Sequence, residues 1–203
     1  AIVHFPAGKA RVQLIDTAGD PDFRGQTLSA MSAVETAAVV VNAVNGVESS
    51  TRRLMRRAKQ RRLCRIMIIN RIDADDLDLE SLVRQIREEF GPECLPVNLP
   101  AANRTAVRDC FFHDDGDTDI FSLAAAHSEI LDQVVEVDET LMSKYLDGEK
   151  ITPEELHDAF EQALREGHLV PICFTSAVTG AGIDELLKFF ERLLPSPLEG
   201  NPP

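Results

Sequence analysis

Short apolar runs alternate with amphipathic segments along the whole chain, a pattern typical of α/β proteins. The runs that predict strands are 2–5, 11–16, 37–44, 64–69, 94–99 and 168–174. The first two are expected to pair antiparallel. The run at 37–44 is almost continuously apolar, which predicts a strand buried on both faces of a parallel sheet.

Helical periodicity occurs between these runs. It is clearest at 79–90, where apolar residues fall at i, i+3, i+4, i+7 and i+11 before Gly91 ends the pattern. Thr152, followed three residues later by Glu155, predicts a capped helix start. The other helices are expected at 24–35, 51–63, 128–146 and 183–194.

The segment 100–123 has few periodic cues. Within it, the sequence HDDGDTD at 113–119 suggests a calcium site, but it lacks both the D-x-[DN]-x-[DN]-G spacing and the closing Glu of a calcium loop. A solvated hairpin loop is the favoured interpretation, and metal binding is the alternative. The five histidines show no metal-ligand spacing.

The strand at 11–16 ends in a carboxylate, Asp16, and a turn through Gly19 follows it. In open α/β sheets, ligands bind at the carboxyl ends of buried strands. An Asp there can hold Mg²⁺ directly or through water, and a glycine amide can approach a terminal phosphate because no side chain blocks it. A strand followed by a simple turn explains the same residues.

Two further strand ends carry candidate base-binding residues. They are Asn70, Arg71, Asp73, Ser176, Ala177 and Val178. Asp73 offers two acceptor oxygens to adjacent N–H groups on one edge of guanine, which adenine cannot match. Arg71 can lay its planar head over the base. The backbone amides of Ser176 and Ala177 are expected to face the guanine carbonyl oxygen.

These motifs together resemble a known family. DTAG at 16–19, NRID at 70–73 and TSAVTG at 175–180 are similar to the third, fourth and fifth signature motifs of GTPases. The sequence between them looks like translation elongation factor G. ETLMSKYLDGE at 139–149 is similar to the family's acidic helix, and LLPSP at 193–197 resembles the end of its G domain. The resemblance covers nearly the whole chain.

The resemblance implies a P-loop NTPase-type α/β sheet with helices on both faces and an inserted α+β subdomain. GTP or GDP with Mg²⁺, held by Asp16 through water, would be the ligand, and the ribosome would be the partner. A cytoplasmic monomer is expected. The implied divisions are a first core part at 1–99, an insertion with acidic helices at 100–167, a last strand and helix at 168–195, and a linker at 196–203.

The chain contains no G-x-x-x-x-G-K-[ST] motif. Gly8 and Lys9 lack the first glycine and the hydroxyl residue of that motif, and they are expected to form a hairpin turn. We therefore expect a piece of a longer protein, without the first strand and phosphate loop. In the family that strand lies between the strands expected at 11–16 and 37–44, so this chain alone should bind nucleotide weakly or not at all.

One substitution affects the expected chemistry. Asp20 occupies the place of the family's histidine that positions the attacking water, so it is the candidate catalytic residue. A carboxylate beside a triphosphate is repelled by the substrate's charge, which predicts slow or modified GTP hydrolysis. The alternative is a degenerate, non-hydrolysing G domain that acts as a ribosome or protein interaction module.

The composition and charge of the chain limit which partners and environments are expected. The formal net charge of −13 argues against nonspecific nucleic-acid binding by the chain as a whole, yet eight arginines and lysines crowd 52–65. That segment is either a solvated helix face, which we favour, or a contact for RNA or an acidic partner. No run is long enough to span a bilayer. The four scattered cysteines predict reduced core residues.

Overall fold

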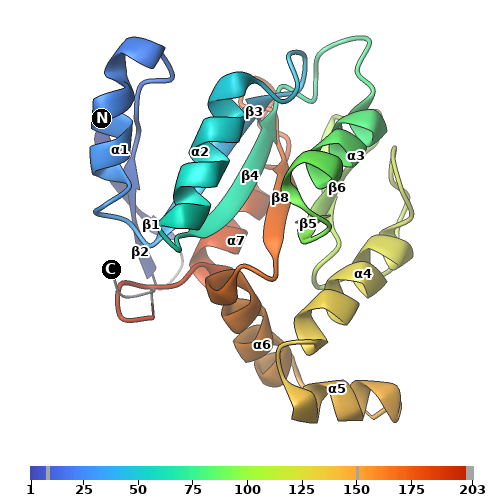
Figure 1. Cartoon of the computed structure of the whole chain (residues 1–203). Helices are drawn as coiled ribbons and strands as arrows, with labels where there is room; N and C mark the ends of the chain where they lie inside the picture. The colour runs from blue at the N-terminus through green and yellow to red at the C-terminus, as the bar shows by residue number, and fades with distance from the viewer. Residues whose placement is uncertain (8–9, 150, 200–203) are drawn as a thin grey trace.

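The computed structural model describes residues 1–7, 10–149 and 151–199. A four-stranded parallel sheet with the order β3-β4-β8-β5 lies at its centre (Figure 1). The strands are β3 (Thr36–Asn42), β4 (Cys64–Asn70), β8 (Val170–Phe174) and β5 (Cys94–Pro96). The two central strands, β4 and β8, are almost wholly buried, and apart from Arg65 and Asn70 of β4 their residues are apolar.

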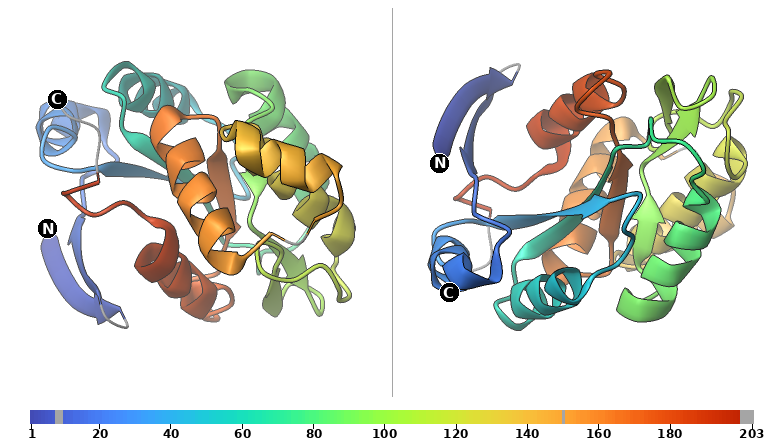
Figure 2. Two further views of the ribbon diagram at one scale, coloured as in Figure 1. Left: turned by 90° about the horizontal axis from the view of Figure 1, so that it is seen from below. Right: turned by 90° about the horizontal axis from the view of Figure 1, so that it is seen from above.

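Helices cover both faces of this sheet, as Figure 2 shows. One face carries α2 (Ser49–Gln60) and α3 (Leu79–Phe90), and the other carries α6 (Pro153–Glu166) and α7 (Ile183–Leu193). Each packs through an apolar stripe, such as the fully buried Ile86 of α3. The expected α/β architecture is confirmed.

The first two strands form a separate hairpin. β1 (Ile2–Ala7) and β2 (Ala10–Ile15) pair antiparallel, as expected, and the predicted turn at Gly8 and Lys9 lies outside the described residues. A short 3-10 turn, η1 (Pro21–Phe23), and α1 (Arg24–Ala30) follow. The expectation that Asp16 ends a buried strand is wrong. β2 joins only β1 in the described structure, and its described side chains are exposed or half-buried.

A cavity of about 1510 Å³ lies between this hairpin and the sheet. It is lined by β2, α1, the outer edge of β3, one side of α2 and the C-terminal part of α7. Val40 of β3 is 60% exposed, so the expectation that the 37–44 strand is buried on both faces is wrong. β3 is one of the two edge strands of this sheet, and its residues alternate between buried and exposed.

Two expected elements are each divided in the structure. The strand predicted at 94–99 becomes β5, within the sheet, and β6 (Asn98–Ala101), which leaves the sheet and pairs antiparallel with β7 (Ala106–Asp109). The helix predicted at 128–146 becomes α4 (Leu123–Val135) and α5 (Glu139–Leu146). They separate because the Asp138 carboxylate accepts the first N–H groups of α5 and caps it.

The segment 113–119 connects β7 to α4, so the expectation of a hairpin loop is wrong, although nearly all of its side chains are exposed. Over the described ranges, no three His, Cys, Asp or Glu side chains are placed to hold a metal. All four cysteines are buried and unbridged, as expected. No helix in the described part of the chain is both long and apolar enough to cross a bilayer.

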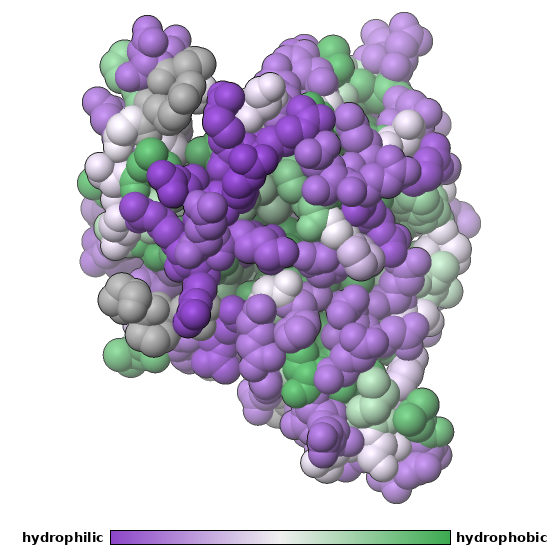
Figure 3. Space-filling view, viewed as in Figure 1, coloured by the Kyte–Doolittle hydropathy of each residue, from purple (hydrophilic) through white to green (hydrophobic). Residues whose placement is uncertain are grey.

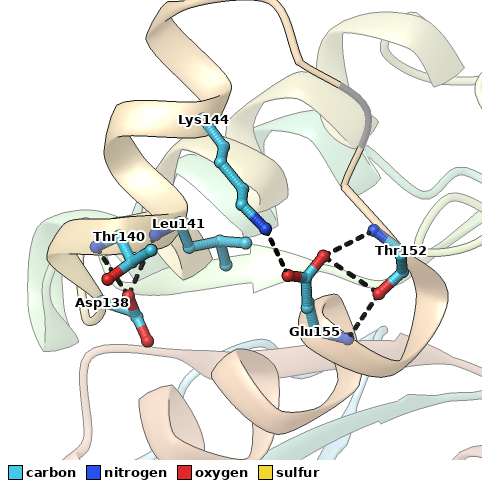
Figure 4. Close-up of polar contacts among 6 residues, drawn as sticks. All are labelled: Asp138, Thr140, Leu141, Lys144, Thr152 and Glu155. Atoms are coloured by element: carbon cyan, nitrogen blue, oxygen red, sulfur yellow. Dashed lines mark hydrogen bonds and ion pairs between the residues drawn. The ribbon is translucent and has the colours of Figure 1, made fainter.

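A polar cluster joins α5 to the start of α6 (Figure 4). The predicted cap is confirmed: the Thr152 hydroxyl accepts the Glu155 N–H, and the Glu155 carboxylate accepts the Thr152 N–H. Lys144 of α5 donates to the same carboxylate at 2.6 Å. This hydrogen bond, helped by those from Thr152, lowers the pKa of Glu155 to about 2.

Candidate nucleotide-binding site

The loops that follow β4 and β8 lie against one another because these strands are adjacent and parallel. The Ala177 N–H donates to Asn70 Oδ1 at 3.0 Å, and the Ser176 hydroxyl donates to the Asp73 carboxylate. Between these contacts, the Ile72 N–H donates to the Thr175 carbonyl at 3.2 Å. The structure therefore brings together four of the six residues that the sequence predicts for base binding, namely Asn70, Asp73, Ser176 and Ala177.

Asp73 keeps capacity for a ligand. Its side chain is half-buried, Oδ1 accepts from Ser176, and Oδ2 has no partner among the described residues. A carboxylate has about four acceptor positions, so two adjacent N–H donors can still be bound. Arg71 is exposed and has a left-handed backbone with φ 69°.

The backbone amides of the second loop differ in availability. The Ser176 N–H donates to the Ala181 carbonyl at 2.8 Å, and the Ala177 N–H is taken by Asn70. Val178 is 80% exposed, and its N–H has no acceptor among the described residues. The two predicted amide donors, Ser176 and Ala177, are therefore both occupied, whereas the Val178 amide can meet a carbonyl oxygen without first breaking a bond.

The predicted phosphate and metal residues lie elsewhere. Asp16, Gly19 and Asp20 line the large cavity, which none of the predicted base-binding residues lines. The Asp20 carboxylate accepts the Asp22 N–H at 2.8 Å and so caps η1. Among the described residues, no hydrogen bond or ion pair joins Asp16, Gly19 or Asp20 to Asp73.

The donor set near Asp16 is sparse. Asp16 is exposed and directly follows β2, and no cluster of three or more ligating side chains surrounds it within the described ranges. In nucleotide sites Mg²⁺ uses one or two carboxylates together with phosphate oxygens and water. A single carboxylate such as Asp16 would therefore fit Mg²⁺, directly or through water, only where a nucleotide supplied the remaining ligands.

Sequence reasoning missed two residues that hold these loops. Asn98 donates to and accepts from the Phe174 backbone, and Arg104 donates to the Ala74 carbonyl. Asn98 could have been noticed in the sequence, because it is a polar residue inside an apolar run. In the structure it is only 3% exposed. Arg104 offered no such signal, because nothing local distinguishes it from a solvent-facing arginine.

The fold and site together define a class: a parallel α/β domain with ligand-binding loops at the carboxyl ends of adjacent strands, as in nucleotide-binding proteins. Comparison with known proteins then specifies the family. The chain belongs to the family described as the elongation factor Tu GTP binding domain, whose sequence profile matches residues 1–196.

Two similar proteins narrow the class further. An elongation factor G-like protein of Thermotoga maritima is 35% identical over 201 residues, which cover 93% of this chain and 29% of that protein. A crystal structure from Thermus thermophilus has a TM-score of 0.86 and 30% identity, covering 98% of this chain and 32% of that chain. The chain thus spans about three tenths of each. The resemblance to an elongation factor G-like GTP-binding domain is confirmed.

Proposed function

We propose that the chain is the guanine-nucleotide-binding unit of an elongation factor G-like GTPase that couples GTP binding and hydrolysis to action on the ribosome. The observation that carries the proposal is the pairing of the two loops through Asn70–Ala177 and Asp73–Ser176. In this proposal the Asp73 carboxylate accepts two N–H groups of guanine. Arg71 covers the base, and the Val178 amide meets the base carbonyl oxygen.

We further propose that the unit works as part of a longer protein. The cavity between β2 and β3 supports this, because both facing strand edges lack a partner among the described residues. An extended segment inserted there would pair with both edges and cover Val40. In the same proposal, residues 1–99 and 168–195 form the GTPase core, and 100–167 form the insertion.

A fluorescent-GDP titration with ADP as competitor tests the proposal. The chain is measured alone and after fusion behind a strand and phosphate loop with the G-x-x-x-x-G-K-[ST] motif. We expect binding that is selective for guanine in the fusion and weak or absent in the chain alone. Exchanging Asp73 for Asn in the fusion should shift the preference from guanine toward xanthine. Unchanged guanine selectivity in D73N would refute the role of Asp73 in base recognition.

Slow hydrolysis is part of the proposal. Asp20 is negatively charged and caps η1, so it is poorly suited to activate a water molecule beside a triphosphate. Replacing Asp20 with His should raise the GTP hydrolysis rate, measured as phosphate release with and without ribosomes. A rate that is unchanged or lower would remove this explanation.

A second candidate function is a non-hydrolysing interaction module, and the surface of α2 supports it. Figure 3 shows the most hydrophilic side chains gathered over this helix. Arg53 and Arg56 are exposed, and their side chains have no hydrogen-bond or ion-pair partner among the described residues. Ribosome-stimulated GTP hydrolysis would favour the first function. Ribosome co-sedimentation without hydrolysis, lost when Arg53 and Arg56 become Glu, would favour the second.

A further inference from the structure

We infer that the β6–β7 hairpin of the insertion is a brace for the guanine-recognition loops, and that Arg104 is a positioning residue for Asp73. The inference rests on the proposed function, because it concerns the same site. It is carried by two contacts at opposite ends of the hairpin, one to the end of β8, where the Ser176 loop begins, and one to the loop that carries Asp73.

The first contact lies at the root of the hairpin. Asn98, the first residue of β6, is 3% exposed and faces the backbone of Phe174. Its Nδ2 donates to the Phe174 carbonyl at 3.2 Å, and its Oδ1 accepts the Phe174 N–H at 2.7 Å. Phe174 is the last residue of β8, so this pair fixes the point from which the Ser176 loop leaves the sheet.

The second contact lies at the tip. Arg104 is half-buried, and its guanidinium donates to the Ala74 carbonyl at 2.6 Å. Ala74 directly follows Asp73, and its own N–H closes a turn onto the Arg71 carbonyl at 3.2 Å. A charged donor on that carbonyl therefore holds the backbone of the turn that presents the Asp73 carboxylate.

The tip itself is built to hold Arg104 in place. Ala102, Asn103 and Arg104 all have left-handed backbones, with φ of 53°, 56° and 65°. Non-glycine residues adopt this conformation at an energetic cost, so surrounding contacts must maintain it. The Asp119 carboxylate does so by accepting the N–H groups of Asn103 and Arg104, at 3.0 and 2.6 Å.

The two contacts have different consequences. Asn98 is part of the core, and its loss would disturb the whole sheet edge. Arg104 is at the surface of the hairpin tip, and its side chain has one hydrogen-bond partner among the described residues, the carbonyl beside Asp73. Removing the Arg104 side chain should therefore release the Asp73 loop and leave the fold in place.

The test compares GDP with inosine diphosphate, whose base lacks the 2-amino group and so donates one N–H fewer to Asp73. Both affinities are measured by titration for the longer protein proposed above and for its R104A, R104K and R108A variants. Arg108 is the matched control because it lies on the same hairpin, is exposed, and its side chain has no hydrogen-bond or ion-pair partner within the described ranges.

We expect R104A to lower the preference for GDP over inosine diphosphate about tenfold, the worth of a hydrogen bond to a charged group. R104K should recover part of that preference, and R108A should keep all of it. If R104A keeps the wild-type ratio, the inference is overturned, even if both affinities fall equally. If the unmodified protein fails to bind GDP, the proposed function itself fails.

Discussion

Replacing Asn98 with Ala should cost far more stability than an average Asn-to-Ala change. The Asn98 carboxamide accepts the Phe174 N–H and donates to the Phe174 C=O. Asn98 and Phe174 are almost inaccessible to solvent, at 3% and 0% exposure. A buried polar group left without a hydrogen-bond partner costs about 1–3 kcal/mol of stability, so losing the partner of both Phe174 backbone groups costs about 2–6 kcal/mol. A water molecule entering the vacated space would bond to both groups, which places the expected loss at about 2–4 kcal/mol.

Urea unfolding followed by circular dichroism measures this loss, provided that the slope of the transition is unchanged. Asn45 is the matched control, because it is exposed and its side chain makes one long hydrogen bond, to Glu48 at 3.5 Å. Asn45→Ala should change stability by less than about 0.5 kcal/mol. A loss below about 1 kcal/mol for Asn98→Ala would show that the Phe174 backbone does not depend on this side chain.

Three further outcomes are expected. Lys144 holds the pKa of Glu155 at about 2, against an ordinary value of 4.5, so the stability from this contact is present above pH 4.5 and is lost as the pH falls toward 2. Urea unfolding of Glu155→Gln should lack that part of the acid dependence. Gly182→Ala should destabilise by at least about 2 kcal/mol, because φ is 76° and the new Cβ would lie 2.3 Å from the Phe174 carbonyl oxygen. Gly180→Ala, with φ 86° and open space, should cost about 1 kcal/mol in the same assay. The four cysteines are buried, and burial raises their pKa values, so a thiol reagent should label them only upon unfolding.

The elements that the sequence predicted well are those whose hydrophobic pattern and terminal residues both lie within the element or directly beside it. α3 has a regular apolar stripe and ends at Gly91, and α6 begins with the reciprocal cap of Thr152 and Glu155. β4 is an apolar run bounded by polar residues, and it lies in the middle of the sheet. Local physical chemistry is sufficient in each case.

The errors have a common cause, which is that strand pairing and burial depend on distant residues. Nothing in the run from Cys94 to Leu99 shows that only its first part finds a partner in β8. The 128–146 segment was predicted as one helix that runs through Asp138. The side chain of Asp138 instead caps the start of α5, and this role depends on its geometry in the folded chain. The apolar run of β3 predicted a fully buried strand, but burial also requires a neighbour on its outer edge.

In the candidate site, too, local motifs were predicted correctly and contacts with distant residues were not. Asn70, Asp73 and Ser176 were identified from motifs, because strand ends in a parallel sheet meet at one edge. The two residues that support those loops were not, since Asn98 and Arg104 act through backbone groups 76 and 30 positions away. Contacts of that sequence separation leave no periodic trace along the chain.

The open edge of β3 has a consequence for the behaviour of the chain in solution. Its sequence, TAAVVVN, contains no charged residue and no proline, and Val40 is 60% exposed. Natural proteins use charges, proline or bulges to keep such edges from joining those of other molecules. The isolated chain should therefore self-associate as its concentration rises, and a segment that pairs with β3 would also keep the protein from aggregating.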